Sequence, residues 1–264
     1  MGRIPRLEIK NMKSRKNSLI SKSALFAMAM ISQVTCFGTD FYTPAEDIDG
    51  LKATTDVQEY LPNVLIIGDS ISIGYTPAVR KHFEGRANVF RPDANCGDTI
   101  NGLRQIDKWL GQKKWDVIHF NWGLHDLCYR HPESKDPGRR DKVRGNQSVP
   151  LDKYKENLEK LVVRLKKTGA QLIWASTTVV PENELGRIAG DELKYNAVAA
   201  EIMERHGVTV NDLHALTANF PPEFFAGYGS GVGNVHFSRD QGSPRIGQQV
   251  SACVEAALTE RLNK

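Results

Sequence analysis

The sequence predicts one α/β domain built on a doubly wound parallel sheet. Apolar runs and amphipathic helical patterns alternate five times between residues 63 and 262, and such alternation is typical of a parallel sheet covered by helices on both faces. The chain has 264 residues, of which 40% are hydrophobic, which is enough to bury one core of that size. We therefore expect a flavodoxin-like, three-layer α/β/α sandwich with a five-stranded parallel sheet.

Each expected element has its own signal. The first strand is the apolar run Val64–Ile67, which has the composition of a central parallel strand. The last helix carries apolar side chains at helical spacing, at positions 246, 250, 253 and 257. The five expected strands lie at Val64, Asn88, Val117, Leu172 and Thr209. The five expected helices cover Ile73–Phe83, Ile100–Leu110, Leu151–Lys167, Asp191–His206 and Gly242–Leu262.

Two polar connections interrupt this pattern, at residues 128–150 and 181–190. The first is densely charged and too long for a plain connection. It is either a lid over a site or a solvated loop.

The first 38 residues have the pattern of an export signal. Basic residues through Lys22 precede an apolar run at residues 24–31, and Val34-Thr35-Cys36 offers a small-residue cleavage site. We expect a signal peptide at residues 1–38, cleaved near residues 36–38, and a periplasmic or secreted protein. The alternatives are an uncleaved anchor and a disordered tail, but the run is shorter than the roughly 20 residues a membrane span needs. Residues 39–62 then form a linker to a folded domain at 63–264.

Charge excludes one class of partner. The chain holds 35 Lys and Arg against 31 Asp and Glu, but residues 1–38 contribute seven of the former and one of the latter. The remainder has 28 basic and 30 acidic residues, a net charge of −2. Because the basic excess belongs to the leader, the folded domain is not expected to bind nucleic acid.

Cysteine usage points to neither a disulfide framework nor a metal site. Cleavage near Cys36 leaves Cys96, Cys128 and Cys253. Cys96 and Cys128 flank two loops described below, so a disulfide between them is conceivable in an oxidising compartment, but the odd count favours free thiols. Neither CxxC nor HExxH spacing occurs, and we expect no metal and no cofactor.

A serine ends the first strand. In Gly68-Asp69-Ser70-Ile71-Ser72, the turn would leave the Ser70 hydroxyl at the carboxyl edge of the sheet, where open α/β folds place their sites. Backbone N–H groups of the following helix point to the same place and favour negative charge. Ser70 is therefore a candidate nucleophile, and the alternative is a helix N-cap.

A histidine near the other end of the chain complements this serine. His236 lies in the segment 233–238, just before the last expected helix. A neutral imidazole, with a pKa near 6.5, is the natural base for a serine hydroxyl at neutral pH. The alternative for a loop histidine is a solvated surface residue. The pairing of His236 with Ser70 favours its interpretation as the base.

Two further loops fit the same site. Gly97 follows the second expected strand, and a glycine there lets a backbone N–H approach a substrate oxygen closely. The alternative is an ordinary loop glycine before a helix capped by Asp98 or Thr99. The third strand, which begins at residue 117, ends in a polar turn that carries His125. His125 is a candidate N–H donor to an oxyanion.

These segments together resemble the four ordered blocks of the GDSL, or SGNH, hydrolases, a superfamily of esterases and acylhydrolases. Ser70 matches the nucleophile, Gly97 the glycine of the second block, and His236 the base of the last. The segment 123–126, Gly-Leu-His-Asp, stands where the family has Gly-x-Asn-Asp. The resemblance implies an oxyanion hole made of the Ser70 and Gly97 N–H groups and the side chain at position 125, and it makes residues 63–264 a hydrolase domain.

The chain departs from the family pattern twice. His125 replaces the asparagine of the third block, which keeps an N–H donor but changes its reach and makes it titratable. Gly233 stands where the family has an acid, three residues before the base. The triad is then reduced to a dyad, with His236 oriented by a backbone carbonyl or by a remote carboxylate such as Asp212. A helix cap or turn is the alternative for Asp212.

The expected function is an exported serine esterase that hydrolyses acyl or acetyl esters through a Ser-His acyl-enzyme. Its expected substrate is a small-molecule or polysaccharide ester. The alternatives are a lysophospholipase or thioesterase-like acylhydrolase, and a non-catalytic carbohydrate- or ligand-binding protein on the same fold. Neither the substrate nor the oligomeric state follows from the sequence.

Overall fold

The computed structural model describes residues 47–48, 51–54 and 57–263. The expected signal peptide at residues 1–38 and the first part of the expected linker lie outside the described residues. Among those described, no helix combines the length and apolarity that crossing a membrane requires.

The predicted parallel sheet is present. Its strand order is β1-β2-β4-β3-β5-β8-β9, and the five strands from β4 to β9 run parallel. They are β4 (Asn88–Pro92), β3 (Asn63–Ile67), β5 (Val117–Phe120), β8 (Gln171–Ala175) and β9 (Thr209–Asn211). Two short strands that the sequence did not predict, β1 (Asp47–Ile48) and β2 (Leu51–Lys52), extend the β4 edge in antiparallel fashion. The flavodoxin-like fold class is confirmed.

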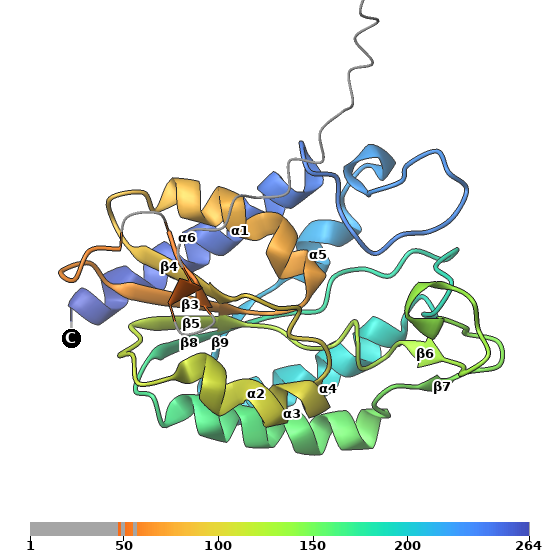
Figure 1. Ribbon diagram of the computed structural model, residues 1–264, viewed down its shortest axis with the longest axis horizontal. Helices are drawn as coiled ribbons and strands as arrows, with labels where there is room; N and C mark the ends of the chain where they lie inside the picture. Colours follow the sequence, from red (N-terminus) through yellow and green to blue (C-terminus); the bar gives the residue numbers. More distant parts are fainter. Residues whose placement is uncertain (1–46, 49–50, 55–56, 264) are drawn as a thin grey trace, which may run out of the picture. The chain divides into compact units, whose positions relative to one another are not determined.

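Helices cover both faces of the sheet, as Figure 1 shows. One face carries α1 (Ser70–His82), α5 (Leu213–Ala218) and α6 (Gly242–Leu262), and the other carries α2 (Thr99–Leu110), α3 (Leu151–Lys166) and α4 (Asp191–His206). The bounds of α2, α3, α4 and α6 match the sequence prediction to within one residue. The first helix begins three residues earlier than expected, at Ser70, and α5 was not predicted.

The core lies between these layers, and its centre is the strand that precedes Ser70. The four residues Val64–Ile67 have no exposed surface, because β3 has a neighbour on each side and helices above and below. Since all five parallel strands end at the same edge, the segments that follow them meet there. These segments contain Ser70, Gly97, His125 and Asp212, and the loop before α6 contains His236.

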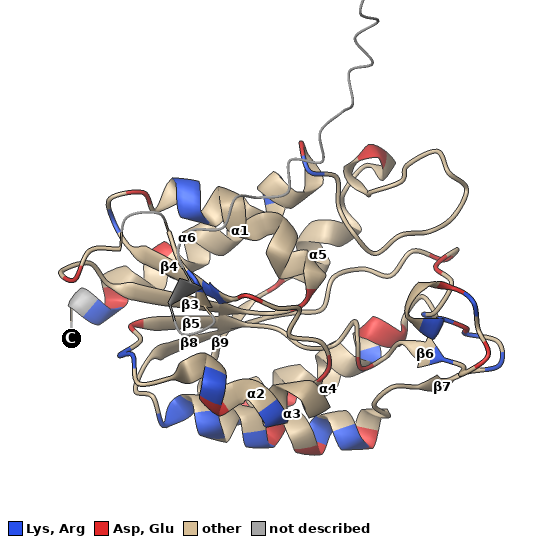
Figure 2. Cartoon of the chain, in the orientation of Figure 1, with Lys and Arg blue, Asp and Glu red and all other residues tan. Residues whose placement is uncertain are grey.

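The 128–150 connection, here called the insertion, has structure of its own. It holds β6 (Tyr129–Arg130), a 3-10 turn η1 (Pro137–Arg139) and β7 (Asn146–Gln147), and β6 pairs with β7 as a separate antiparallel sheet. Figure 2 shows that charged residues gather on it, whereas the loop between the second 3-10 turn, η2 (Pro222–Phe224), and α6 has few.

Candidate active site

The turn after β3 leaves the Ser70 hydroxyl available. Asp69, not Ser70, is the N-cap of α1, and its carboxylate accepts a hydrogen bond from the Ile71 N–H at 2.9 Å. Ser70 is the first residue of the helix, so its hydroxyl takes no part in the cap. A Cβ at position 68 would lie 3.0 Å from Ser72 Cβ, so a larger residue there would require Ser72 to shift by a few tenths of an ångström.

Ser70 and His236 are in contact although 166 residues separate them in the chain. Ser70 Oγ lies 2.8 Å from His236 Nε2, within the distance at which a base removes a proton. Burial lowers the pKa of His236 below its usual 6.5, and the nearby carboxylate of Asp69 opposes that shift. At neutral pH the imidazole is therefore uncharged and able to accept a proton.

The other ring nitrogen of His236 is held by Asn234, a residue that the sequence reasoning missed. Asn234 Oδ1 lies 2.7 Å from His236 Nδ1 and accepts a second bond from the His236 backbone N–H at 3.0 Å. Because the amide oxygen only accepts, Nδ1 carries the ring proton and Nε2 presents its lone pair to Ser70. The available signal was an Asn two residues before a loop histidine, the spacing of an Asx turn.

Gly233, which stands at the family's acid position, has no room for a side chain. A Cβ there would lie 2.6 Å from the backbone nitrogen of Glu184 and 2.7 Å from the carbonyl carbon of Asn183. Gly233 forms an isolated parallel bridge with Glu184, and its N–H donates to the Asn183 carbonyl at 3.1 Å. The backbone of the 181–190 loop therefore fills the space that an acid at this position would occupy.

Asp212 points elsewhere. It is the N-cap of α5, and its Oδ1 accepts from the Ala215 N–H at 3.0 Å and from Ser176 Oγ at 2.8 Å. In the structure Asp212 is therefore a helix cap, the alternative considered for it above. The hydrogen bond on His236 Nδ1 is made by Asn234 and not by Asp212.

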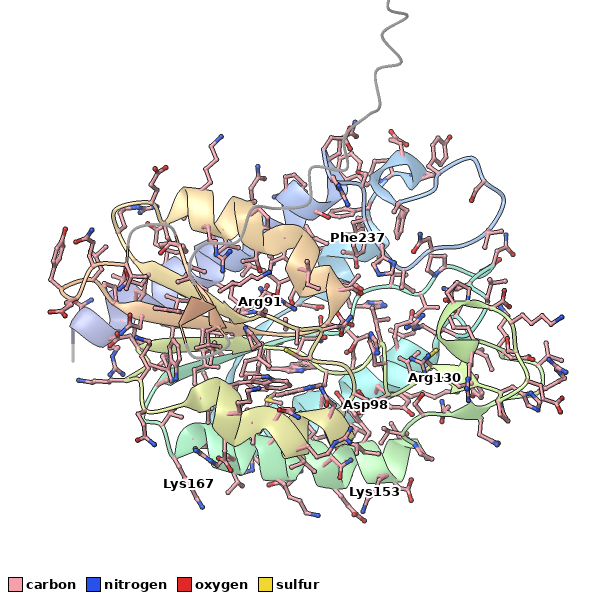
Figure 3. All side chains as sticks on the ribbon, viewed as in Figure 1. Arg91, Asp98, Arg130, Lys153, Lys167 and Phe237 are labelled. Atoms are coloured by element: carbon pink, nitrogen blue, oxygen red, sulfur yellow. The ribbon has the colours of Figure 1, made fainter. Side chains whose placement is uncertain are left out.

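Gly97 lies beside the nucleophile turn, because the preceding Cys96 N–H donates to the Gly68 carbonyl at 3.2 Å. Its φ of +65° lies in the left-handed region, which requires glycine. The Gly97 N–H donates to Asn95 Oδ1 at 2.9 Å, so a substrate oxygen would have to share or replace that acceptor. Its function as an oxyanion donor stays a prediction. The next residue, Asp98, caps α2 (Figure 3).

His125 lies in the same electrostatic environment as His236. Burial lowers its pKa, the carboxylate of Asp69 opposes the shift, and the guanidinium of Arg187 adds to it. The turn that carries it is fixed by Asp126, whose Oδ1 accepts from the Thr99 N–H at 2.9 Å and the Thr99 hydroxyl at 2.6 Å. The predicted donor function of the neutral His125 is not tested by these contacts.

A buried arginine that the sequence reasoning did not single out holds the nucleophile turn. Arg91, at the end of β4 (Figure 3), donates to the carbonyls of Gly68 at 3.1 Å and Ala94 at 2.9 Å and to Ser72 Oγ at 3.0 Å. It therefore joins the Ser70 turn to the Gly97 loop. A charged residue inside an otherwise apolar strand was the available signal.

The three cysteines among the described residues are free. Cys96 and Cys128 are buried and unpaired, and so is the partly buried Cys253, as the odd count favoured. Burial raises the pKa of the Cys96 thiol to about 11, which makes it unreactive at neutral pH. Within the described part of the chain, no group of three or more His, Cys, Asp or Glu is placed to hold a metal ion.

The fold resembles solved hydrolase structures. It is similar to a lipase/acylhydrolase from Enterococcus faecalis, with 18% identity, a TM-score of 0.59 and coverage of 74% of this chain and 96% of that one. An acetyl xylan esterase from Geobacillus stearothermophilus matches with 16% identity, a TM-score of 0.55 and coverage of 75% and 94%. A second acetyl xylan esterase, AlAXEase, matches with 14% identity, a TM-score of 0.58 and coverage of 73% and 99%.

The sequence assigns the family. An α/β/α sandwich with a serine at the end of its central strand and a histidine 2.8 Å away has the architecture of a serine hydrolase. No curated protein matches the sequence significantly. Residues 66–240, more than half of the chain, match the model of the GDSL-like lipase/acylhydrolase family. The chain therefore belongs to that family, and the predicted class of enzyme, a hydrolase acting on ester bonds, is confirmed.

Proposed function

We propose that this protein is an exported serine esterase that cleaves acyl or acetyl esters through a covalent intermediate on Ser70. The observation that carries the proposal is the 2.8 Å contact between Ser70 Oγ and His236 Nε2, with Nδ1 of the same ring held by Asn234. A serine hydroxyl is a weak nucleophile until a positioned base takes its proton. Here the base is neutral, correctly protonated and within reach.

The reaction has two halves. Ser70 Oγ attacks the ester carbonyl carbon while its proton passes to His236 Nε2, and the carbonyl oxygen becomes negatively charged. That charge is stabilised by the N–H groups of Ser70 and Gly97 and by His125. The imidazolium then protonates the departing alcohol, which leaves an acyl-Ser70 ester. Water attacks this ester with His236 again as base, releasing the acid and restoring the serine.

Two cavities border the elements that carry the site, although neither is lined by Ser70 or His236. The smaller one lies behind the Gly68–Ser72 turn and measures about 10 Å³, at most enough for one water molecule. A cleft of about 820 Å³ lies between the insertion, the 181–190 loop and the loop before His236. Charged and polar residues line most of it, including Lys135, Asp136, Lys142 and Asn183. A sugar fits such a lining better than an aliphatic chain does.

The test uses p-nitrophenyl esters of graded chain length. We expect the highest kcat/KM on acetate, with kcat falling by about 10,000-fold or more in Ser70→Ala. His236→Ala should cost about as much, and the double variant little more than either, because the pair acts as a unit. A maximum on octanoate or longer would instead support the lysophospholipase or thioesterase alternative.

A second measurement separates the enzyme from a non-catalytic binder, the alternative raised by Gly233 and His125. A serine-directed phosphonate should label wild-type protein at Ser70 and leave Ser70→Ala unlabelled, as intact mass would show. Absence of both the adduct and hydrolysis in folded wild-type protein would overturn the proposal.

A further inference from the structure

The 181–190 loop, a polar connection in the sequence, contributes two buried charges. The Glu184 side chain is 0% exposed and the Arg187 side chain is 6% exposed. Ionised groups are rarely removed from water this completely unless they are paired, because desolvation is costly. A loop that only connects β8 with α4 needs no such pair.

Glu184 is shared between two arginines. Its Oε1 accepts from Arg187 Nη1 at 2.9 Å and from Arg140 Nη1 at 3.1 Å, and its Oε2 accepts from the Gly186 N–H at 2.6 Å. Arg140 belongs to the insertion, which is also joined to this loop where the Tyr129 N–H donates to the Gly186 carbonyl at 2.7 Å. One carboxylate therefore faces two guanidinium groups.

Arg187 also reaches the turn after β5. Its Nε donates to the Leu124 carbonyl at 2.7 Å, and the next residue is His125. Thr177 packs closely against the same turn, since a Cβ at Gly123 would lie 2.0 Å from Thr177 Oγ1. The guanidinium thus sets the position of the peptide group that leads directly into His125.

The same loop borders the turn that carries His236. The backbone bridge between Glu184 and Gly233 ends three residues before the base. The charges that act on His236 come from Asp69, Arg187, Arg140 and Glu184; after burial, the two arginines lower its pKa and the two acids oppose them. Arg187 also lowers the pKa of His125. Its charge therefore reaches both histidines of the site.

Building on the proposed esterase function, we propose that Arg187 is a positioning residue for the reaction. Its Nε–Leu124 bond fixes the turn that presents His125 to the developing oxyanion, and its pairing with Glu184 ties that turn to the loop beside His236. Its positive charge adds to the effect of burial, which favours the neutral form of His236 that accepts the proton of Ser70.

The test compares Arg187→Gln, Arg187→Lys and a matched control, Arg140→Gln. Loss of the Leu124 contact in Arg187→Gln should lower kcat about 10-fold to 100-fold, the scale of a misplaced catalytic group, with KM within about threefold. Glu184 retains Arg140 as its partner, so the variant keeps a paired carboxylate. Arg140→Gln removes a guanidinium from the same carboxylate without touching the turn, so kcat measured above the acid limb should change by less than about threefold. The acid limb itself should move to higher pH, because Arg140 also lowers the pKa of His236.

The pH profile separates charge from geometry. Removing the Arg187 charge raises the pKa of His236, so the acid limb of kcat/KM should move to higher pH in Arg187→Gln and stay in place in Arg187→Lys. The lysine variant keeps the charge but not the two-sided guanidinium contact, so its kcat should still fall. A merely structural arginine would lower the melting temperature and leave the acid limb unmoved.

A double-mutant cycle that combines Arg187→Gln with His125→Ala tests whether Arg187 acts through His125. If Arg187 acts through His125, the double variant should lose little more than His125→Ala alone. If wild type is active and Arg187→Gln retains both its kcat and its acid limb, the role of Arg187 is overturned but the esterase is not. The same holds if the kcat losses of Arg187→Gln and His125→Ala multiply in the double variant. An unlabelled, inactive wild type overturns the esterase itself.

Discussion

A single amide oxygen decides the protonation of the base in this site. Asn234 Oδ1 accepts from both the ring and the backbone of His236, and an amide does so without contributing charge. The imidazolium that forms during attack is therefore oriented at Nδ1 by a neutral amide instead of a carboxylate. This predicts that orientation can be separated from charge at position 234.

We expect Asn234→Asp to retain activity and to shift the acid limb of kcat/KM to higher pH, because a carboxylate against Nδ1 stabilises the imidazolium and raises the pKa of His236. Asn234→Ala should lose about 100-fold or more in kcat, since it frees the ring tautomer and orientation. Rate profiles between pH 5 and 9 would measure both.

Asp212→Asn is the matched control, because it alters a carboxylate that caps α5 instead of contacting His236. Its kcat should change by less than about threefold, against the roughly 10,000-fold loss that follows removal of an orienting acid. A larger loss in folded protein would contradict the assignment of the orienting group to Asn234.

Residue-scale prediction from the sequence succeeded where the signal was local. Ser70 and His236 could be named because a serine after an apolar strand and a histidine before a helix are visible in the chain, and the structure brings them together. The spacing of Asn234 before His236 was a local signal that was not used. The exclusion of a side chain at Gly233 could not be predicted, because it is set by a loop about fifty residues away in sequence.

At the scale of elements, the turn after β5 and the start of α2 are joined by one buried carboxyl group. Asp126 Oδ1 accepts two bonds from Thr99, the first residue of α2, while Oδ2 has no hydrogen-bond partner among the residues that the structure describes. Burial raises the pKa of Asp126 to about 8. The group therefore remains protonated in the folded protein at pH values where the unfolded chain, with a pKa of about 3.9, has lost the proton.

This raised pKa predicts a pH-dependent stability. Between about pH 4 and pH 8 the folded state binds the extra proton, so the stabilisation is full at the acidic end and is lost as pH rises through the folded pKa. The melting temperature of wild type should fall more between pH 5 and pH 8 than that of Asp126→Asn. All other titrating groups are common to both proteins, and equal slopes would show that Asp126 is ionised in the fold.

Element boundaries follow from contacts that a periodic pattern does not contain. Apolar periodicity placed the start of α1 at Ile73, whereas the Asp69 cap moves it to Ser70. The two-residue strand β2 forms on the edge of β4, and β1 forms on the edge of β2, so no sequence signal of their own could reveal them. The longer helices were predictable because each buries one face against the sheet.

At the scale of the whole molecule, basic and acidic residues are distributed unevenly along the chain. Residues 1–38 carry seven Lys or Arg and one acid, and the remainder has a net charge of −2. We expect the full chain, expressed in a bacterium with an export pathway, to be recovered outside the cytoplasm without its first 36–38 residues. Intact mass gives the new N-terminus, and isoelectric focusing should give a value below the 8.8 of the full sequence.

Ala27→Lys supplies the control, since a charge inside the apolar run at residues 24–31 should block export. Recovery of uncleaved wild-type chain from the cytoplasm would contradict the predicted signal peptide.

The five parallel strands of the sheet were predictable at the scale of the whole molecule, because the alternation of strands and helices alone implies them. The packing of the insertion against the 181–190 loop was not, because it is made by contacts between two loops that carry no periodic pattern.

The contact between Gly233 and Glu184 also has an evolutionary consequence. Asparagine and aspartate codons differ by one nucleotide, as do the matching codons of glycine and aspartate, so a carboxylate is equally accessible to mutation at positions 233 and 234. Only position 234 can accept it without a clash, because the loop backbone occupies the space beside Gly233. A lineage starting from this structure would regain an acid-bearing triad through Asn234, and a return through Gly233 would first require the 181–190 loop to be remodelled.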